Sequence, residues 1–271
     1  MRITGATRVF TILASPSRHV IAPVIFNRLF ELLELDMVYI AHDTPAGSLP
    51  GVLESFRAWS NLGGFNVTIP HKEAAAGLLD RLLPPASNLG VVNTVIRGPE
   101  GGLTGYNTDG IGAVRAIGDV RGERCLVIGA GGAARAVVHA LLQAGALSVA
   151  MLNRSPDRTR SLMALFPKAA VDVFCPETLP GMDVVIQATP VADRVPLDLD
   201  LSALKGSTRI LETVMRETAL GREALRRGLH LVPGHLMLFH QTAENFRLLT
   251  GIEAPEDLVV RAFRDAGFDL P

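Results

Sequence analysis

Three short stretches of this chain carry groups that fit the transfer of a hydride. They read GFNVTIPHK at residues 64–72, NTDG at residues 107–110 and GAGGAAR at residues 129–135. The third stretch is typical of a turn that binds the pyrophosphate of a dinucleotide. The first two supply Lys72 and Asp109, and oxidation of an alcohol needs such a group to take the hydroxyl proton. Together the three stretches predict an oxidoreductase.

Lys72 and Asp109 form the predicted catalytic pair. A lysine can serve as general acid and base when burial or its neighbours adjust its pKa, and an aspartate at hydrogen-bond distance can orient both the lysine and the substrate hydroxyl. A structural interpretation stays open for each residue. Lys72 follows Pro70 and can be a solvated residue at a helix start, and Asp109 can cap the helix that follows it.

The glycine turn predicts a cofactor site. The pattern Gly129-x-Gly131-Gly132 follows an apolar strand expected at 125–128 and opens a helix expected at 133–144. A dinucleotide fingerprint requires this context, in which backbone N–H groups approach a phosphate at a helix N-terminus. The residues assigned to cofactor binding are Gly129, Ala130, Gly131, Gly132 and Ala133. A turn that serves packing alone is the alternative.

The segment after the next strand, expected at 148–152, predicts NADP rather than NAD. An acidic side chain here binds the ribose 2′-hydroxyl of NAD, whereas a basic one accepts the 2′-phosphate of NADP. The chain has Asn153, Arg154 and Ser155, followed by Arg158, and a guanidinium fits a phosphate well. Asp157 argues for NAD but also suits the first turn of a helix. A solvated helix face is the alternative for Arg158.

Apolar periodicity predicts an α/β protein. Strand-like and helix-like runs alternate in the first part of the chain, and a turn at 98–101 joins two strand-like runs. The expected strands are 9–14, 37–41, 65–69, 91–96 and 102–106, and the expected helices are 25–35, 49–62 and 111–117. Gly63 and Gly64 are expected to end the second of these helices.

The rest of the chain repeats strand and helix in the manner of a doubly wound, Rossmann-type sheet. The further strands are expected at 171–174, 184–188 and 209–212, and the further helices at 157–165, 236–249 and 255–266. We therefore predict an α/β substrate-binding and catalytic domain at 1–117 and an NADP-binding domain at 118–236. The C-terminal helices at 237–271 are expected to pack back on the first domain.

Composition limits the possible partners. The 271 residues are 48% hydrophobic and 20% charged with a net charge of −1, which gives no electrostatic reason to expect nucleic acid or an anionic membrane. No signal-peptide pattern and no membrane-spanning apolar run are evident. Cys125 and Cys175 are too few for a disulfide framework or a metal site, and both are expected to be buried. We expect a cytoplasmic monomer or homodimer that acts on a small molecule without a metal.

In their order along the chain, these stretches resemble the shikimate/quinate dehydrogenase family from about Thr11 to Gly251. Lys72 and Asp109 match the family's catalytic positions in Asn-Val-Thr-x-Pro-x-Lys and Asn-Thr-Asp-Gly. The resemblance implies a shikimate-pathway enzyme of aromatic amino acid biosynthesis. Such an enzyme moves a hydride reversibly between NADP and a ring hydroxyl of shikimate or a related polyol acid. A quinate- or shikimate-type enzyme, or one for another hydroxy compound, that uses NAD is one alternative, and a non-catalytic NADP-binding sensor is another.

The resemblance also implies further ligand-binding residues. Matched to the family's motifs, the substrate-binding residues are Asn66, Thr68, Asn93 and Gln241. Their amides and hydroxyls suit a polyhydroxylated ring because they both donate and accept hydrogen bonds. The further cofactor-binding residues are Thr189 and Val191 in the segment 187–192, and Gly234 and Met237 in the segment 234–238. As a sequence feature alone, Met237 would more often be a core residue.

One loop departs from the family pattern. The family's carboxylate-binding loop reads Gly-x-Pro-x-x-His-Ser-x-Ser-Pro, whereas residues 14–23 read ASPSRHVIAP, so Val20 and Ala22 replace both serines. The family's Tyr-x-Pro-x-x-Thr likewise becomes TVMRET at 213–218. Each lost hydrogen bond to a charged group costs about 1.5 to 3 kcal/mol.

Two explanations of the altered loop stay open. Either the substrate has no carboxylate at this place, or another residue of the loop holds it, namely Ser15, Ser17, Arg18 or His19. We expect a divergent paralogue that keeps hydride chemistry on a cyclic or short polyol and binds shikimate weakly or not at all.

Overall fold

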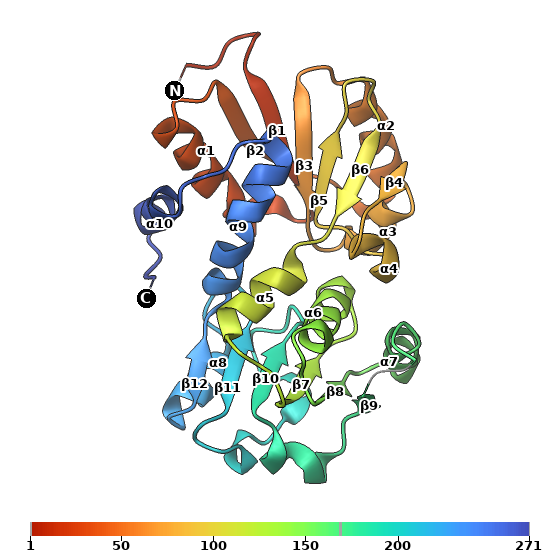
Figure 1. Ribbon diagram of the computed structural model, residues 1–271, viewed down its shortest axis with the longest axis vertical. Coiled ribbons are helices and arrows are strands. Elements are labelled where there is room, and N and C mark those ends of the chain that lie inside the picture. The colour runs from red at the N-terminus through yellow and green to blue at the C-terminus, as the bar shows by residue number, and fades with distance from the viewer. Residues whose placement is uncertain (1, 168–169, 271) are drawn as a thin grey trace. The chain divides into compact units, whose positions relative to one another are not determined.

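The computed structural model describes residues 2–167 and 170–270, which form two compact units (Figure 1). The first unit comprises the chain up to Thr108 and from Gln241 onward, and the second comprises Asp109–His240. The sequence placed these divisions after residues 117 and 236. Helix α5 (Asp109–Ile117) belongs to the second unit because it packs against α6 (Gly132–Gln143), where a Cβ on Gly110 would lie 2.5 Å from the Ala136 carbonyl oxygen.

The first unit contains a mixed six-stranded sheet in the order β2-β1-β3-β5-β6-β4. Its strands are β1 (Arg8–Ala14), β2 (Met37–Asp43), β3 (Leu62–Val67), β4 (Arg81–Leu82), β5 (Thr94–Arg97) and β6 (Leu103–Tyr106). Strands β2, β1 and β3 are parallel, and the predicted hairpin β5–β6 joins β3 antiparallel. The carboxyl ends of the three parallel strands therefore share one edge of the sheet.

The helices of the first unit follow the predicted order, with short additions. They are α1 (Ala22–Leu32), α2 (Leu49–Ala58), α3 (Lys72–Ala76), α4 (Ala86–Leu89), the C-terminal part of α9 (Gly234–Thr250), and α10 (Glu256–Asp265). Short 3₁₀ turns η1 (Ser17–His19) and η2 (Ala46–Ser48) follow β1 and β2. The sequence did not predict α3 or α4, because each is too short to show a helical period.

Two glycines were interpreted wrongly as a helix end. Helix α2 already ends at Ala58, and Gly63 and Gly64 lie inside β3. A Cβ on Gly64 would lie 2.5 Å from the Val95 carbonyl oxygen, and one on Gly63 would lie 2.5 Å from the Phe10 ring. Glycine is required here because the neighbouring strand and ring approach the backbone of β3 closely.

The C-terminal helices pack on the first sheet, as predicted. The Phe246 ring of α9 lies 6.0 Å from that of Phe26 and 5.7 Å from that of Phe30, both on α1. Arg28 of α1 also pairs with Asp265 of α10 at 2.7 Å. A buried aromatic cluster, supported by this ion pair at its margin, fixes the C-terminal part of the chain to the first unit.

The second unit is a doubly wound parallel sheet in the order β12-β11-β10-β7-β8-β9. Its strands are β7 (Arg124–Ile128), β8 (Ser148–Leu152), β9 (Val171–Val173), β10 (Val184–Gln187), β11 (Arg209–Glu212) and β12 (His230–Val232). The other helices are α7 (Pro156–Met163) and α8 (Ala219–Arg226), with 3₁₀ turns η3 (Pro176–Gly181), η4 (Pro196–Asp198) and η5 (Leu201–Ala203). This strand order confirms the predicted Rossmann-type fold.

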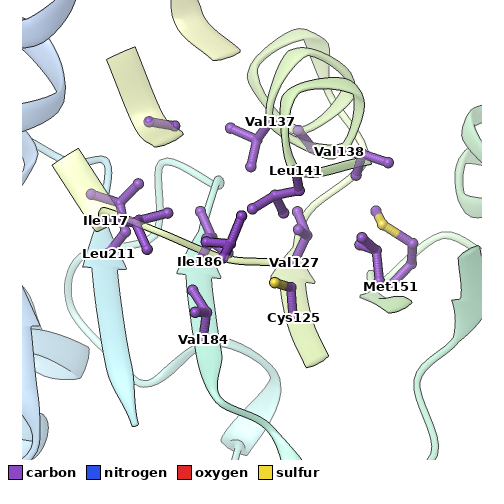
Figure 2. Packing of buried hydrophobic residues seen from close by; sticks show 14 of the residues in the cluster. Ile117, Cys125, Val127, Val137, Val138, Leu141, Met151, Val184, Ile186 and Leu211 are labelled. Atoms are coloured by element: carbon purple, nitrogen blue, oxygen red, sulfur yellow. The ribbon is translucent and has the colours of Figure 1, made fainter. Parts of the chain in front are cut away.

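One of the two buried clusters of the second unit lies between the sheet and α6 (Figure 2). Val137 and Leu141 of α6 face Val127 and Ile186 of the central strands. Cys125 lies in this core, and burial raises the pKa of its thiol to about 12. Cys175 is exposed, contrary to expectation, because β9 ends before it and it begins the η3 turn.

The described residues contain neither a membrane-spanning helix nor a cluster of metal-binding side chains. None of the helices in residues 2–167 and 170–270 is both long and apolar enough to cross a bilayer. In the same part of the chain, no three His, Cys, Asp or Glu side chains gather in a way that would hold a metal ion.

Candidate active site

The carboxyl edge of the first sheet brings three loops together. The backbone N–H of Thr44, after β2, donates to the Ala14 carbonyl at 2.9 Å, and that of Thr68, after β3, donates to the Leu13 carbonyl at 3.0 Å. The Nε2 of buried His71 lies 2.7 Å from the Thr44 carbonyl oxygen. These bonds hold the loops after β1, β2 and β3 against one another, at the edge where parallel sheets bind ligands.

Lys72 is positioned by this arrangement. It is the first residue of α3 and is half-buried, and the backbone N–H of Val92 donates to its carbonyl oxygen at 3.0 Å. Asp109 is the first residue of α5, is 2% exposed and belongs to the second unit. Each residue is therefore the first of a helix, and their pairing in catalysis stays a prediction.

Three of the four predicted substrate-binding residues share one hydrogen-bond network. The Asn66 amide donates to Thr94 Oγ1 at 2.9 Å and to the Asn93 carbonyl at 3.0 Å. The Asn93 amide in turn donates to Gln241 Oε1 at 3.2 Å. Thr68 follows Asn66 after the end of β3 and is half-buried. The structure thus gathers Asn66, Asn93 and Gln241 in the first unit.

Sequence reasoning missed several members of this network. Tyr39 Oη donates to Asn66 Oδ1 at 2.6 Å, and burial raises the tyrosine pKa well above its ordinary value, so the hydroxyl stays neutral. Thr94 and Thr108 each place Oγ1 within 2.8 Å of Asn245 Oδ1. The spacing of Gln241 and Asn245, four residues apart on α9, is the sequence signal that puts both on one helix face.

The altered loop after β1 is hydrogen-bonded to the Asp43 carboxylate at the end of β2. Ser15 Oγ donates to Asp43 Oδ1 at 3.3 Å, and the Ser17 backbone N–H donates to Asp43 Oδ2 at 2.8 Å. The bond from the Ser17 backbone is the main reason why the Asp43 pKa is lowered. The sequence analysis missed Asp43 because it ended the strand at residue 41, whereas β2 continues to Asp43 beside Ala14.

The remaining residues of this loop differ in exposure. Arg18 and His19 are exposed on the η1 turn, Val20 is half-buried, and Ala22 is buried at the start of α1. The Val20 backbone N–H donates to the Ser17 carbonyl at 3.0 Å. Pro23, in the first turn of α1, has no N–H to offer.

In the second unit the glycine turn follows β7 at the point where the strand order reverses. Gly129 has φ of +117°, and a Cβ there would lie 2.9 Å from the Ala188 carbonyl oxygen and from Thr189 Cγ2. Gly131 caps α6, and no atom lies within 4 Å of its hypothetical Cβ among the described residues. Gly129 is therefore needed by the fold itself, whereas the space at Gly131 is open to a ligand.

The predicted NADP-selecting residues follow the neighbouring strand. Strand β8 pairs with β7, and the Gly129 backbone N–H donates to the Leu152 carbonyl at 2.8 Å, so Asn153 begins next to the glycine turn. Asn153 donates to the Ser155 carbonyl at 3.0 Å, and Ser155 caps α7. Arg154 and Arg158 are exposed. Asp157 pairs with Arg160 in the first turns of α7.

The turn after β10 lies on the other side of β7. Gln187 is fully buried, and its Oε1 accepts hydrogen bonds from the Thr189 backbone and hydroxyl at 3.3 and 3.0 Å. Its amide donates to the Val191 carbonyl at 3.0 Å. Gln187 therefore holds Thr189 and Val191 in a fixed turn beside Gly129.

The last predicted cofactor residues follow β12, at the start of α9. A Cβ on Gly234, at the start of α9, would lie 2.8 Å from the Glu212 carbonyl oxygen. Met237 is 6% exposed and belongs to the core of the second unit. Burial raises the pKa of Glu212 to about 7, although Thr218 Oγ1 donates to it at 2.7 Å and the Val214 N–H at 3.0 Å. The sequence analysis had not singled out Glu212.

Comparison with known proteins identifies the family. The model described as "Shikimate dehydrogenase substrate binding domain" matches residues 12–95, and that of "Shikimate / quinate 5-dehydrogenase" matches residues 112–209. A shikimate dehydrogenase (NADP(+)) of Rubrobacter xylanophilus is 38% identical over 281 residues, which cover 98% of this chain and 99% of that protein.

Solved structures agree with this assignment. The crystal structure of shikimate dehydrogenase from Aquifex aeolicus superposes with a TM-score of 0.89 at 32% identity, covering 97% of this chain and all (100%) of that one. The enzyme from Thermus thermophilus, in complex with NADP(H) and shikimate, gives a TM-score of 0.85 at 35% identity, covering 96% and 99% of the two chains. The predicted family is confirmed: this chain belongs to the shikimate dehydrogenases.

Proposed function

We propose that this chain is an NADP-dependent dehydrogenase that oxidises and re-forms a ring hydroxyl of shikimate or a related cyclic polyol. The observation that carries the proposal is the carboxyl edge of the second sheet. There the Gly129–Gly131 turn lies next to the end of β8, after which come exposed Arg154 and, on α7, exposed Arg158, with no acid directly at the strand end. Two guanidinium groups beside a pyrophosphate turn suit the 2′-phosphate of NADP.

The second unit fits the cofactor on its own geometry. The N–H groups at the start of α6 and the open space at Gly131 suit the pyrophosphate. The buried Gln187 holds Thr189 and Val191 beside the same turn, and we assign both to cofactor binding. Gly234 and Met237 are assigned to the nicotinamide side. NADP, when bound, supplies the acceptor for the hydride.

Lys72 handles the proton in the proposed reaction. As the carbinol C–H bond breaks and its electron pair leaves as hydride, the hydroxyl proton passes to Lys72 Nζ and a ketone forms. In the reverse reaction, the hydride and the proton return to the ketone. Asp109 orients the substrate hydroxyl and the lysine. Lys72 and Asp109 are the first residues of α3 and α5, respectively.

The amide network positions the ring. Its members are already hydrogen-bonded to one another. Thr94 joins Asn66 to Asn93, and the Asn93 amide bonds to Gln241 and Thr108. These side chains are therefore oriented before a ligand arrives. Preorganised amides can donate to and accept from ring hydroxyls with little further ordering. We assign these three amide residues and Thr68 to the substrate.

The proposal extends to the cellular location, the oligomeric state and the roles of the two units. We propose that the enzyme works in the cytoplasm as a monomer or homodimer, with the residues before Asp109 binding substrate and the Asp109–His240 unit binding NADP. Size-exclusion chromatography with light scattering measures the oligomeric state.

The proposal is tested by NADPH formation. Purified protein is given NADP with shikimate, quinate and a panel of related hydroxy acids and cyclic polyols, and the series is repeated with NAD. We expect turnover with at least one ring compound and a preference for NADP. Turnover with NAD but not with NADP would mean that NAD is the cofactor. Tight NADP binding without any turnover would favour a non-catalytic NADP sensor instead.

A further inference from the structure

The loop between β1 and α1 offers few groups that can hold an anion. A carboxylate is bound by N–H or O–H donors or by a cation. Ser15 Oγ and the Ser17 N–H are already bonded to Asp43, and the Val20 N–H is bonded to the Ser17 carbonyl. Val20 and Ala22 have no polar side-chain atom. The side of the loop that leads into α1 is therefore apolar.

Asp43 strengthens this conclusion. Its carboxylate is ionised at neutral pH like that of any ordinary aspartate, and the bond from the Ser17 backbone lowers its pKa further. It lies at the carboxyl end of β2, in register with Ala14 of β1. A second carboxylate placed against the same serines would compete for their donors and meet the charge of the first. Like charges about 4 Å apart repel by about 1 kcal/mol even in water, which is roughly a fivefold loss of affinity.

The loop lies at the edge that carries the proposed catalytic lysine. The Ser15 N–H donates to the Ile69 carbonyl at 3.2 Å, and Ile69 belongs to the turn that leads from β3 to Lys72. The amides of Asn66 and Asn93 belong to the same unit. A ring bound by these amides, with its reacting hydroxyl at Lys72, would direct another substituent toward Val20 and Ala22.

We propose that this substituent is uncharged and that the preferred substrate is a neutral cyclic polyol, or its ketone, rather than a hydroxy acid. Val20 and Ala22 are the residues that set this preference. The inference rests on the proposed function and narrows its substrate class. The reaction is unchanged: the carbinol carbon gives up a hydride to NADP, the hydroxyl gives its proton to Lys72, and a ring ketone forms.

The test compares two compounds that differ at one substituent. Shikimate is compared with the alcohol in which its carboxylate is reduced to a hydroxymethyl group, and kcat/KM is measured for each with saturating NADP. We expect the wild-type protein to prefer the alcohol by about tenfold or more. Equal values, or a preference for shikimate, would overturn the inference.

Variants of the loop assign the preference to its residues. The double variant Val20→Ser/Ala22→Ser should raise kcat/KM for shikimate by about tenfold and leave that for the alcohol within about threefold. Val24→Ser is the matched control. Val24 lies on α1 like Ala22 and is 50% exposed, so this substitution should change neither value. Arg18→Ala tests the remaining cation of the loop. If it lowered shikimate binding tenfold, Arg18 would be a carboxylate ligand and the inference would be wrong.

Binding separates this inference from the proposed function. Dissociation constants for both compounds are measured by calorimetry on the NADP-bound protein, and a melting curve checks that each variant folds. If neither compound is oxidised, the proposed function fails for this ring. Tighter binding of the alcohol by tenfold would still support the inference, whereas tighter binding of shikimate, or binding of neither compound, would contradict it.

Discussion

The two sheets present very different carboxyl edges. On the first sheet, the polar groups are bonded to one another or to an acid, as in the Asn66–Asn93–Gln241 network and the loop that holds Asp43. On the second sheet, the edge carries backbone N–H groups, open space at Gly131 and exposed arginines. The glycine turn of the cofactor edge follows the family pattern, whereas the family pattern is lost in the loop after β1 and again at 213–218, after β11. We therefore propose that the change in the loop after β1 affects substrate recognition and leaves cofactor binding in place.

The acids at the two edges differ in the same way. Asp43 is exposed and its pKa is lowered by the loop's hydrogen bonds. Glu212 is 3% exposed and its pKa is raised to about 7, because burial outweighs the hydrogen bonds that it accepts. The first acid is a fixed charge beside the substrate loop, and the second changes its charge near neutral pH.

Among the effects on stability and ligand binding, the largest is expected from the glycines of the second edge. Gly129→Ala places a Cβ 2.9 Å from a backbone oxygen at a φ of +117°, so the variant should lose about 2 to 4 kcal/mol of stability and NADP affinity should fall about a hundredfold. Gly131→Ala meets no atom of the described chain within 4 Å. It should melt like the wild type but bind NADP about tenfold more weakly, because the ligand needs that space. Calorimetry and melting curves measure both, and wild-type NADP affinity in Gly131→Ala would contradict the placement of the pyrophosphate.

The pH dependence of stability distinguishes the two acids. Because the folded pKa of Glu212 is about 7 and the unfolded value is near 4.5, the folded protein binds more protons between these values, and its stability falls as pH rises through them. The shift corresponds to about 3 kcal/mol. Glu212→Gln should remove this fall, so the wild type and the variant should diverge between about pH 4 and about pH 8 in chemical denaturation. Parallel curves would show that Glu212 titrates normally.

Asp43 should behave in the opposite sense. Its folded pKa is lowered, so its stabilising contribution is present above the unfolded value of 3.8 and is lost as pH falls through the folded pKa. Asp43→Asn should therefore be less stable than the wild type at neutral pH, and the difference should shrink in acid. A constant difference across the same denaturation series would mean that charge has no part in holding the loop.

The arginines of the second edge should govern the choice of cofactor. Arg154→Ala or Arg158→Ala should each weaken NADP binding about tenfold, because a charge-assisted hydrogen bond is worth about 1.5 to 3 kcal/mol. NAD binding should change little. Arg160→Ala is the matched control, since Arg160 already pairs with Asp157 on the same helix. Equal losses for NADP and NAD would mean that these side chains do not contact the 2′-phosphate.

The smallest effect concerns the buried hydroxyls of the first unit. Thr94 Oγ1 lies within hydrogen-bond distance of Asn66, Asn93 and Asn245, so Thr94→Val should cost about 1 to 2 kcal/mol. Thr11 of β1 is equally buried, but its Oγ1 has no hydrogen-bond partner in the part of the chain that the structure describes. Thr11→Val should therefore be neutral or stabilising. If urea unfolding gave the same loss of unfolding free energy for Thr94→Val and Thr11→Val, the network would contribute nothing beyond packing.

Much of the fold follows from local patterns. The strand, glycine turn and helix around Gly129 were predictable because each signal lies within a few residues. The short β12 was not, because three residues show too little of a period, and α8 was missed although its apolar residues, among them buried Leu220 and Ala224, recur at helical spacing. Gly63 and Gly64 were mistaken for a helix end, since the close approach of Val95 and Phe10 is a tertiary contact.

The site was predictable in its residue types and less so in its contacts. Motif matching identified Asn93 and Gln241, yet their hydrogen bond joins positions 148 residues apart. Asp43 was missed because its role depends on the register of β2 against β1. Long-range partners of this kind are set by the pairing of strands and helices, which a single sequence does not display.

The central claim is that Lys72 carries the proton of a hydride-transfer reaction. It is tested most directly by kcat of Lys72→Ala on the compound that the wild type turns over fastest, with calorimetric binding of NADP and substrate measured on the same protein. Lys205→Ala, whose lysine lies 3.7 Å from Asp183 in the second unit, is the control. We expect kcat to fall about 10² to 10⁴-fold in Lys72→Ala alone, while both ligands bind within a few-fold of wild type. An unchanged kcat, with the same ligands bound, would contradict it.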